Sequence, residues 1–242
     1  MNDFAGKNVA VLNATGAIAR DVVQNFAARG LRVAAIDTPA AFAAAADWSQ
    51  GKEVSQIMVT ADAAALLDSC ERALGGPVDI LVCAAPPVGQ VTILDMQAAD
   101  LRRIVEDELC VPALLMQEAG RRMARRGNGR IISLFSMSAK TGVHTKVGPF
   151  AAAKGGLLAY SRVMAAELAP TGVTVNAIAT SLFEPQVAIL EYAEREALAK
   201  AIPVRRFGKV SEASHAVLFL ASDQAAFITG ETMNLSGGRF MD

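Results

Sequence analysis

The chain has 242 residues, of which 52% are hydrophobic, and its formal net charge at pH 7 is -1. This length suits one large α/β unit, and no apolar run reaches the roughly 18 residues that a transmembrane helix needs. Because acids and bases are interspersed, the charge gives no reason to expect binding to nucleic acid or to an anionic membrane.

The first residues, MNDFAGKNVAVLNA, lack the basic flank, long apolar stretch and cleavage site of a secretory signal. We therefore expect a cytoplasmic protein. Its three cysteines, Cys70, Cys83 and Cys110, form no CxxC pair and lie inside apolar segments. This pattern predicts buried thiols in a reducing compartment and no metal cluster.

Short β-like apolar runs alternate along the chain with longer amphipathic helices. Seven runs are predicted strands, at residues 8–13, 32–37, 54–59, 79–84, 130–135, 173–178 and 231–236. After the first strand, Val22 and Phe26 belong to an apolar helical stripe that Gly30 ends, and Asp62 is a predicted cap of the next helix. The alternation predicts a single α/β domain over residues 1–242, with a doubly wound parallel sheet and helices on both faces.

Two longer helices follow, at about residues 97–126 and 149–169, and the first contains Pro112. The second is nearly apolar on all sides over its first half, so we expect a partner subunit to cover it. The first ends in the basic run RRMARRGNGR at 121–130. Such cations complement the negative end of a helix dipole, and a site for a phosphorylated substrate is the alternative.

Motifs of the second half carry a resemblance to a known family. They are GRIISLFS, the lysine of AAAKGGL, TGVTVNAIA, and the stretch RRFGKVSEASHAVLFLASDQAAFITGETMNLSGG. Over nearly its whole length the chain resembles the short-chain dehydrogenase/reductase family. The resemblance implies a Rossmann-like sheet, a nicotinamide dinucleotide cofactor, and dimers or tetramers formed through the two long helices.

The family's glycine-rich loop, TGxxxGxG, falls on LNATGAIA at residues 12–19, and its three glycines become Asn13, Ala17 and Ala19. Each added Cβ narrows the room for a pyrophosphate, although asparagine still tolerates a left-handed turn and Gly16 offers a shifted alternative. The positions that would hold a dinucleotide, if one binds, are Asn13, Gly16, Ala17 and Ile18.

Asp37 ends the second strand, 20 residues after Ala17, where the resemblance places an acid on the adenosine ribose. This favours NAD over NADP; the competing interpretation is a strand-end turn residue. The family's NNAG becomes CAAP at 83–86, and Pro86 removes a backbone donor. Its PG becomes Thr180 and Ser181. We expect NAD if any cofactor, or none bound by this chain.

The catalytic positions differ further. The resemblance places Glu108 where the family has asparagine and Phe150 where it has its proton-donating tyrosine. It retains the lysine as Lys154 and the serine as Ser136, with Ser138 the alternative. Because an acid or base at the carbonyl oxygen contributes about 10²- to 10⁴-fold in rate, the loss of the tyrosine is severe.

Three functions remain open. The first is an inactive subunit, similar to those of hetero-oligomeric family members, which assembles with an active NAD-dependent paralogue that acts on a hydroxyl or ketone, including one on an acyl-CoA. The second is an active NAD-dependent enzyme in which water or His144 replaces the tyrosine. The third is a non-redox enzyme that uses Glu108 and Lys154. Lys146 and Tyr160 form no recognised alternative triad.

One further segment, residues 182–206, occupies the position of the family's substrate lid. Leu190, Leu198 and Ile202 give it an apolar side. That side could cover a substrate, the core of the domain, or a partner subunit.

Overall fold

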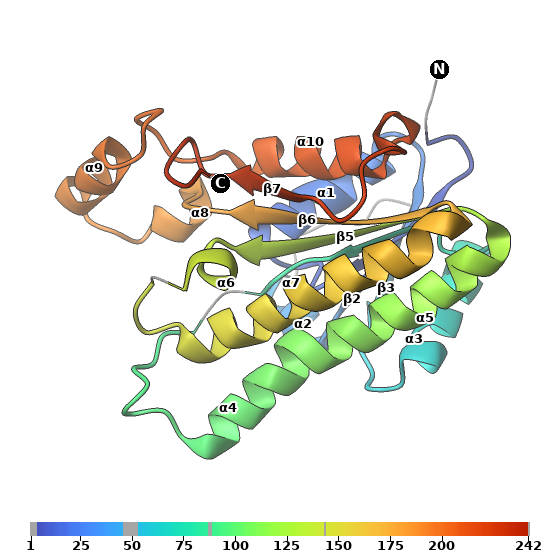
Figure 1. Ribbon diagram of the computed structural model, residues 1–242, viewed down its shortest axis with the longest axis horizontal. Coiled ribbons are helices and arrows are strands. Elements are labelled where there is room, and N and C mark those ends of the chain that lie inside the picture. The colour runs from blue at the N-terminus through green and yellow to red at the C-terminus, as the bar shows by residue number, and fades with distance from the viewer. Residues whose placement is uncertain (1–3, 46–52, 87–88, 143, 242) are drawn as a thin grey trace.

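The computed structural model describes residues 4–45, 53–86, 89–142 and 144–241. Its centre is a seven-stranded sheet with the order β3-β2-β1-β4-β5-β6-β7, in which all neighbours are parallel (Figure 1). The fold is Rossmann-like, and all seven predicted strands are confirmed. Their bounds are β1 Asn8–Leu12, β2 Arg32–Asp37, β3 Val54–Met58, β4 Ile80–Cys83, β5 Gly129–Ser136, β6 Val173–Thr180 and β7 Thr232–Leu235.

The central strands are buried on both sides, which explains why they read as continuous apolar runs. Alternate residues of one strand face opposite layers: Val9 and Val11 of β1 belong to one core cluster, whereas Ala10 and Leu12 belong to the other. The two clusters lie on opposite faces of the sheet and are covered by different helices.

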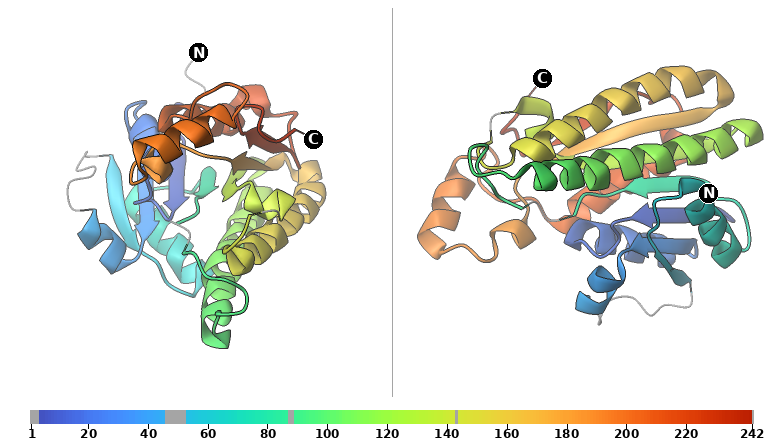
Figure 2. Two further views of the ribbon diagram at one scale, coloured as in Figure 1. Left: turned by 90° about the vertical axis from the view of Figure 1, so that its left-hand side faces the viewer. Right: turned by 90° about the horizontal axis from the view of Figure 1, so that it is seen from below.

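One face is covered by α1 (Ala17–Ala27), α2 (Pro39–Ala44) and α10 (Val210–Ala221). Asp21 of α1 accepts a hydrogen bond from Ser214 of α10, which joins the two helices. The other face is covered by α3 (Ala63–Leu74), α5 (Val111–Arg126) and α7 (Gly148–Leu168). Figure 2 shows α5 and α7 running side by side along this face. The Asp62 side chain caps α3 as predicted, since it accepts bonds from the amides of Ala64 and Ala65.

The first long helix runs over residues 98–126, close to the predicted 97–126, but it is not α-helical throughout. It consists of α4 (Ala98–Val105), a π-helical turn η1 (Glu106–Cys110) and α5. Pro112 has no amide hydrogen with which to bond the Glu108 carbonyl four residues earlier, and its ring clashes with that carbonyl. The chain instead widens, and the Val111 amide donates to the carbonyl of Glu106, five residues back.

The basic run at the end of α5 is engaged within the molecule. Arg122 lies 2.7 Å from Glu71 and 2.8 Å from Asp68 of α3, and 2.9 Å from Glu118 of its own helix. Arg126 donates a hydrogen bond to the carbonyl of Val78. These contacts join α3 to α5 and favour a structural role for the run.

The segment 182–206 projects beyond the carboxyl ends of β5, β6 and β7 (Figure 1). It contains α8 (Glu184–Val187) and α9 (Tyr192–Lys200) and has a small core cluster of its own around Val187, Ile202 and Phe207. Shorter elements are α6 (Ser138–Thr141), η2 (Ala169–Thr171) and η3 (Asp223–Ala225). Within the described ranges, no helix is both long and apolar enough to cross a bilayer.

Gly172, which joins α7 to β6, provides a test of this packing. Its φ is +81°, and an added Cβ would lie 2.4 Å from the carbonyl oxygen of Gly127. Gly30 has the same φ, but nothing lies within 4 Å of its added Cβ. We expect Gly30→Ala to lower the free energy of unfolding by about 1–2 kcal/mol, the left-handed penalty alone. Gly172→Ala should lower it by clearly more, because it adds a clash with backbone.

Urea unfolding of the two variants measures the difference. Equal losses would show that the contact between the two connections does not constrain the fold.

Candidate active site

The predicted site residues lie at the carboxyl edge of the parallel sheet. Ser136 ends β5, Asp37 ends β2, and the loop that contains Asn13 follows β1. In open α/β sheets this edge is where ligands bind. Lys154 comes from the second turn of α7, and Glu108 from the π-helical turn of the neighbouring helix.

Lys154 and Glu108 form a buried ion pair. The Lys154 Nζ lies 2.8 Å from the Glu108 Oε2, and the two side chains are 1% and 8% exposed. The acids next to Glu108, Glu106 and Asp107, are both exposed, so Glu108 alone of the three turns inward. The pair connects α7 to the turn between α4 and α5.

Burial and nearby charges shift the pKa values of Glu108 and of the neighbouring Cys83. Burial raises the pKa of the Glu108 carboxyl above its ordinary value, the Lys154 ammonium opposes the rise, and the charge of Asp107 adds to it. Burial also raises the pKa of the Cys83 thiol to about 12, although Lys154 opposes that rise too. Cys83 is therefore a neutral, buried thiol at pH 7.

Phe150 lies one helical turn before Lys154 and is 4% exposed. The centroid of its ring is 6.0 Å from the Lys154 Nζ, within the range of a cation–π contact. The ring has no ionisable proton, so this position packs against the ammonium but cannot exchange a proton with a substrate.

A second cluster joins both candidate serines. The hydroxyl oxygens of Ser136 and Ser138 are 2.9 Å apart, and the Ser138 oxygen is 3.2 Å from Nδ1 of His144. The Ser138 amide also donates to the Ser136 oxygen. The structure thus connects Ser136 to His144 through Ser138, a chain that the sequence spacing did not predict.

The carboxyl-terminal segment covers His144. The rings of His144 and Phe240 pack edge to face at 5.8 Å, and Ser236 holds Phe240 by bonds to its amide and carbonyl. Burial, aided by the charge of Arg239, lowers the pKa of His144. No sequence signal pointed to Phe240 or Arg239, because nearly 100 residues separate them from His144.

The altered glycine loop keeps its backbone turn. Asn13 has φ 55°, the left-handed conformation that asparagine tolerates, and its side-chain amide donates to the Ala84 carbonyl at 2.9 Å. Gly16 precedes α1, and Ala17 is the first helical residue. The side chain of Asn13 therefore links the loop after β1 to the loop after β4.

Asp37 is engaged with the same loop. Its Oδ2 accepts bonds from the amide and the hydroxyl of Thr15 at 3.0 and 2.8 Å, and its Oδ1 accepts from the Thr38 amide at 2.8 Å. The residue is 6% exposed. This carboxylate ties β2 to the loop and has little surface left for a ribose, so the residues present fit a dinucleotide poorly.

Other candidates lie apart from both clusters. Lys146 is exposed with φ 62°, and Tyr160 packs against the core beneath α7. Burial, together with Glu167, raises the pKa of Tyr160, which disfavours its phenolate. The described part of the chain contains no group of three or more His, Cys, Asp or Glu residues that could hold a metal ion.

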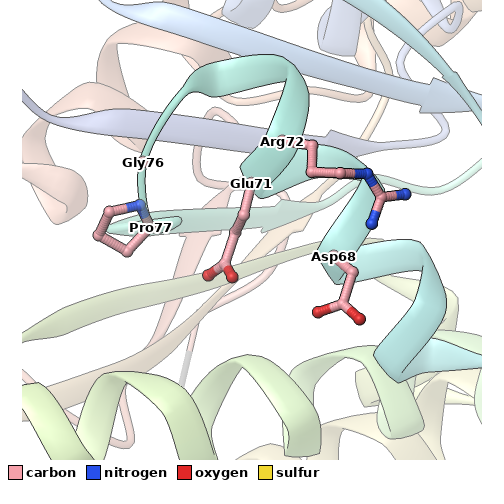
Figure 3. A pocket seen from close by; sticks show the side chains of 5 residues that line it. All are labelled: Asp68, Glu71, Arg72, Gly76 and Pro77. Atoms are coloured by element: carbon pink, nitrogen blue, oxygen red, sulfur yellow. The ribbon is translucent and has the colours of Figure 1, made fainter.

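Two cavities in the described part of the chain are lined by neither the Lys154–Glu108 pair nor the candidate serines. The first, of about 490 Å³, is lined by the five residues labelled in Figure 3: Asp68, Glu71, Arg72, Gly76 and Pro77. It lies at the turn before β4, at the opposite edge of the sheet. The second, of about 200 Å³, lies between the segment 182–206, the start of α10 and the end of β7.

Comparisons with known proteins agree with the family resemblance and with the fold. A family model described as enoyl-(acyl carrier protein) reductase matches residues 13–239. The 3-oxoacyl-[acyl-carrier-protein] reductase FabG of Escherichia coli (strain K12) is 33% identical over 243 residues, which cover 99% of each chain. Nodulation protein G of Azospirillum brasilense is 33% identical over 239 residues, or 94% of this chain and 96% of that protein.

A solved structure supports the fold alone. The crystal structure of 3-oxoacyl-[acyl-carrier protein] reductase from Brucella melitensis ATCC 23457 has a TM-score of 0.87 and 24% sequence identity. It covers 100% of this chain and 94% of that one.

The buried ion pair generates a stability prediction. Lys154→Met leaves Glu108 buried without its partner and should lower the free energy of unfolding by about 3–5 kcal/mol. Combining it with Glu108→Leu should recover most of that loss, because two apolar side chains can then pack together. As a control, Lys200→Met removes an exposed pair with Glu196 and should change stability by less than about 0.5 kcal/mol. Urea midpoints measure all three, and a double variant no more stable than Lys154→Met would refute the pairing.

Proposed function

The chain belongs to the short-chain dehydrogenase/reductase family, and from that premise we propose that it is a catalytically degenerate subunit which assembles with an active, NAD-dependent member of the same family. The observation that carries this proposal is the pairing of Lys154. Lys154 is bound to Glu108 instead of serving a tyrosine, and Phe150 fills the tyrosine's position.

Reduction of a ketone, or oxidation of a hydroxyl, needs proton transfer at the oxygen as well as hydride transfer at the carbon. Phe150 cannot supply that proton, and the Lys154 ammonium has a carboxylate partner 2.8 Å away. Ser136 remains, but a serine hydroxyl without an acidic partner is a poor donor. These features together support a loss of the chain's own dehydrogenase chemistry.

The cofactor region supports the same proposal. The carboxylate of Asp37 is occupied by Thr15 and Thr38, and the amide of Asn13 is bonded to Ala84. A dinucleotide would have to displace these internal bonds. NAD remains the expected cofactor of the assembly, and the proposal assigns it to the active subunit.

The substrate class follows from the relatives. The relative from Escherichia coli, 33% identical to this chain, is named as a reductase of 3-oxoacyl groups on acyl carrier protein. We therefore assign to the active subunit a hydroxyl or ketone on an acyl thioester, including an acyl-CoA. One candidate assembly is 2-[hydroxy(phenyl)methyl]succinyl-CoA dehydrogenase, whose inactive subunit this chain resembles in its lost motifs. We place the assembly in the cytoplasm.

The proposed contact surface lies on the two long helices. On α7, the exposed residues Ala152, Ala159, Val163 and Ala166 follow one another at helical spacing. On the neighbouring helix, Leu101 and Leu114 are 36% and 46% exposed. Small side chains allow close approach of a second helix pair, and a homologous subunit offers a matching surface. The segment 182–206 would then cover a substrate or the partner.

A second candidate is an active enzyme with a replaced proton donor. The chain from Ser136 through Ser138 to His144 favours it, because a neutral histidine could receive and return a proton through the two hydroxyls. The third possibility, a non-redox enzyme built on Glu108 and Lys154, is favoured least, since both groups are buried against each other.

The first two candidates make opposite predictions for the isolated chain. We expect no saturable quenching or enhancement of NADH fluorescence at micromolar concentrations. Turnover of acetoacetyl-CoA should be at least about 10²-fold below that of an active family member measured in parallel. Saturable binding with turnover that His144→Ala abolishes would instead establish the second candidate.

The contact surface is tested by placing a charge on it. Ala159→Glu adds a carboxylate to the exposed face of α7, and burying that charge in an assembly would be unfavourable. We expect a co-expressed complex to dissociate to the 25.3 kDa chain. Ala197→Glu, on the exposed surface of α9, is the matched control and should leave the mass unchanged. Light scattering after gel filtration measures both, and an intact Ala159→Glu complex would exclude this surface.

A further inference from the structure

We infer that Glu108 is a positioning residue which holds the Lys154 ammonium in a neutralised pair, so that the chain carries two separate blocks to proton transfer: the missing phenol at position 150 and the occupied lysine. This inference rests on the proposed function and concerns the same site. Restoring a tyrosine at position 150 alone would therefore leave the pairing of Lys154 with Glu108 in place.

The missing phenol at position 150 and the occupied lysine lie side by side in the structure. Phe150 and Lys154 are four residues apart and therefore share one face of α7. The ammonium lies 6.0 Å from the ring centroid and 2.8 Å from the Glu108 carboxylate. A phenol introduced at position 150 would thus meet an ammonium whose charge is already balanced by a closer partner.

Backbone structure explains why Glu108 can reach the lysine. Pro112 interrupts the hydrogen bonding of the long helix at the Glu108 carbonyl, and the π-helical turn at residues 106–110 follows from that interruption. Glu106 and Asp107 stay exposed, whereas Glu108 is buried toward α7. The position of the carboxylate is therefore fixed by the main chain and does not depend on a flexible surface side chain.

The electrostatic consequence has a definite sign. A cation near a phenol favours the phenolate and lowers the pKa of the phenol, whereas a carboxylate opposes this. With Glu108 present, the two charges largely cancel at position 150. With the carboxylate removed, the Lys154 ammonium remains unbalanced, 6.0 Å from the ring centroid at position 150. At an effective dielectric constant of about 20 this corresponds to a phenol pKa roughly two pH units lower.

Two other described groups act on the pair. Cys83 of β4 interacts with the charge of Lys154. Burial raises the pKa of its thiol to about 12, so the thiol stays neutral over most of the pH range of the titration. Asp107 adds a negative charge from the exposed side of the turn and raises the pKa of Glu108. Neither group replaces Glu108 as the partner of the ammonium.

The test compares Phe150→Tyr with Phe150→Tyr/Glu108→Gln by titrating phenolate absorbance in the purified chain. Tyr160 and Tyr192 contribute the same background to the corresponding proteins that keep Phe150, and that background is subtracted. We expect the phenol introduced by Phe150→Tyr to titrate at or above its ordinary pKa. In the double variant it should titrate about two pH units lower.

Glu106→Gln in the same Phe150→Tyr background is the matched control. It removes an exposed acid from the same turn. The pKa of the phenol should then stay within about 0.3 pH units of its value in the Phe150→Tyr protein. If the double variant does not fold, Glu108→Asn replaces Glu108→Gln. Equal titration with and without the Glu108 carboxylate in a folded protein would overturn the inference.

The measurement uses neither cofactor nor partner subunit, so it separates this inference from the proposed function. NADH binding and turnover by the unaltered chain would refute the proposed function without changing the phenol titration. An unshifted phenol in the double variant would refute the role of Glu108, while the missing phenol at position 150 would still account for inactivity.

Discussion

Lys154, in the second turn of α7, is 1% exposed, and a charge at that depth requires a partner. In this chain the partner is Glu108, which comes from the neighbouring long helix. The pair thereby fixes the spacing of the two helices on one face of the sheet. The same bond joins the helix pair and gives the ammonium a carboxylate partner.

The sheet could be predicted from sequence because its strands are buried on both faces and therefore read as uninterrupted apolar runs between helices of a different period. Gly30 and Asp62 marked helix ends for local reasons, namely a left-handed turn and a side-chain cap. The π-helical turn was missed because Pro112 was treated as tolerated within the helix. Pro112 leaves the Glu108 carbonyl without its helical hydrogen-bond donor, and the spacing of apolar residues carries no information about that loss.

The candidate site was less predictable. Matching positions to the family indicated which residues had changed, including Phe150 and Glu108, but not what their neighbours would be. The bond of Asp37 to Thr15 joins the end of β2 to the loop after β1, and the bond of Ser138 to His144 joins the start of α6 to a residue six positions later. No periodicity encodes such contacts, and they decide whether a carboxylate or a hydroxyl is available to a ligand.

The buried pair also constrains how this sequence can change over generations. Replacing Glu108 alone would leave a buried cation without a counter-charge, and replacing Lys154 alone would leave a buried acid in the same position. Each single replacement within the pair therefore passes through a less stable protein. Natural selection for stability alone would therefore keep Lys154 and Glu108 together, whatever chemistry the site performs.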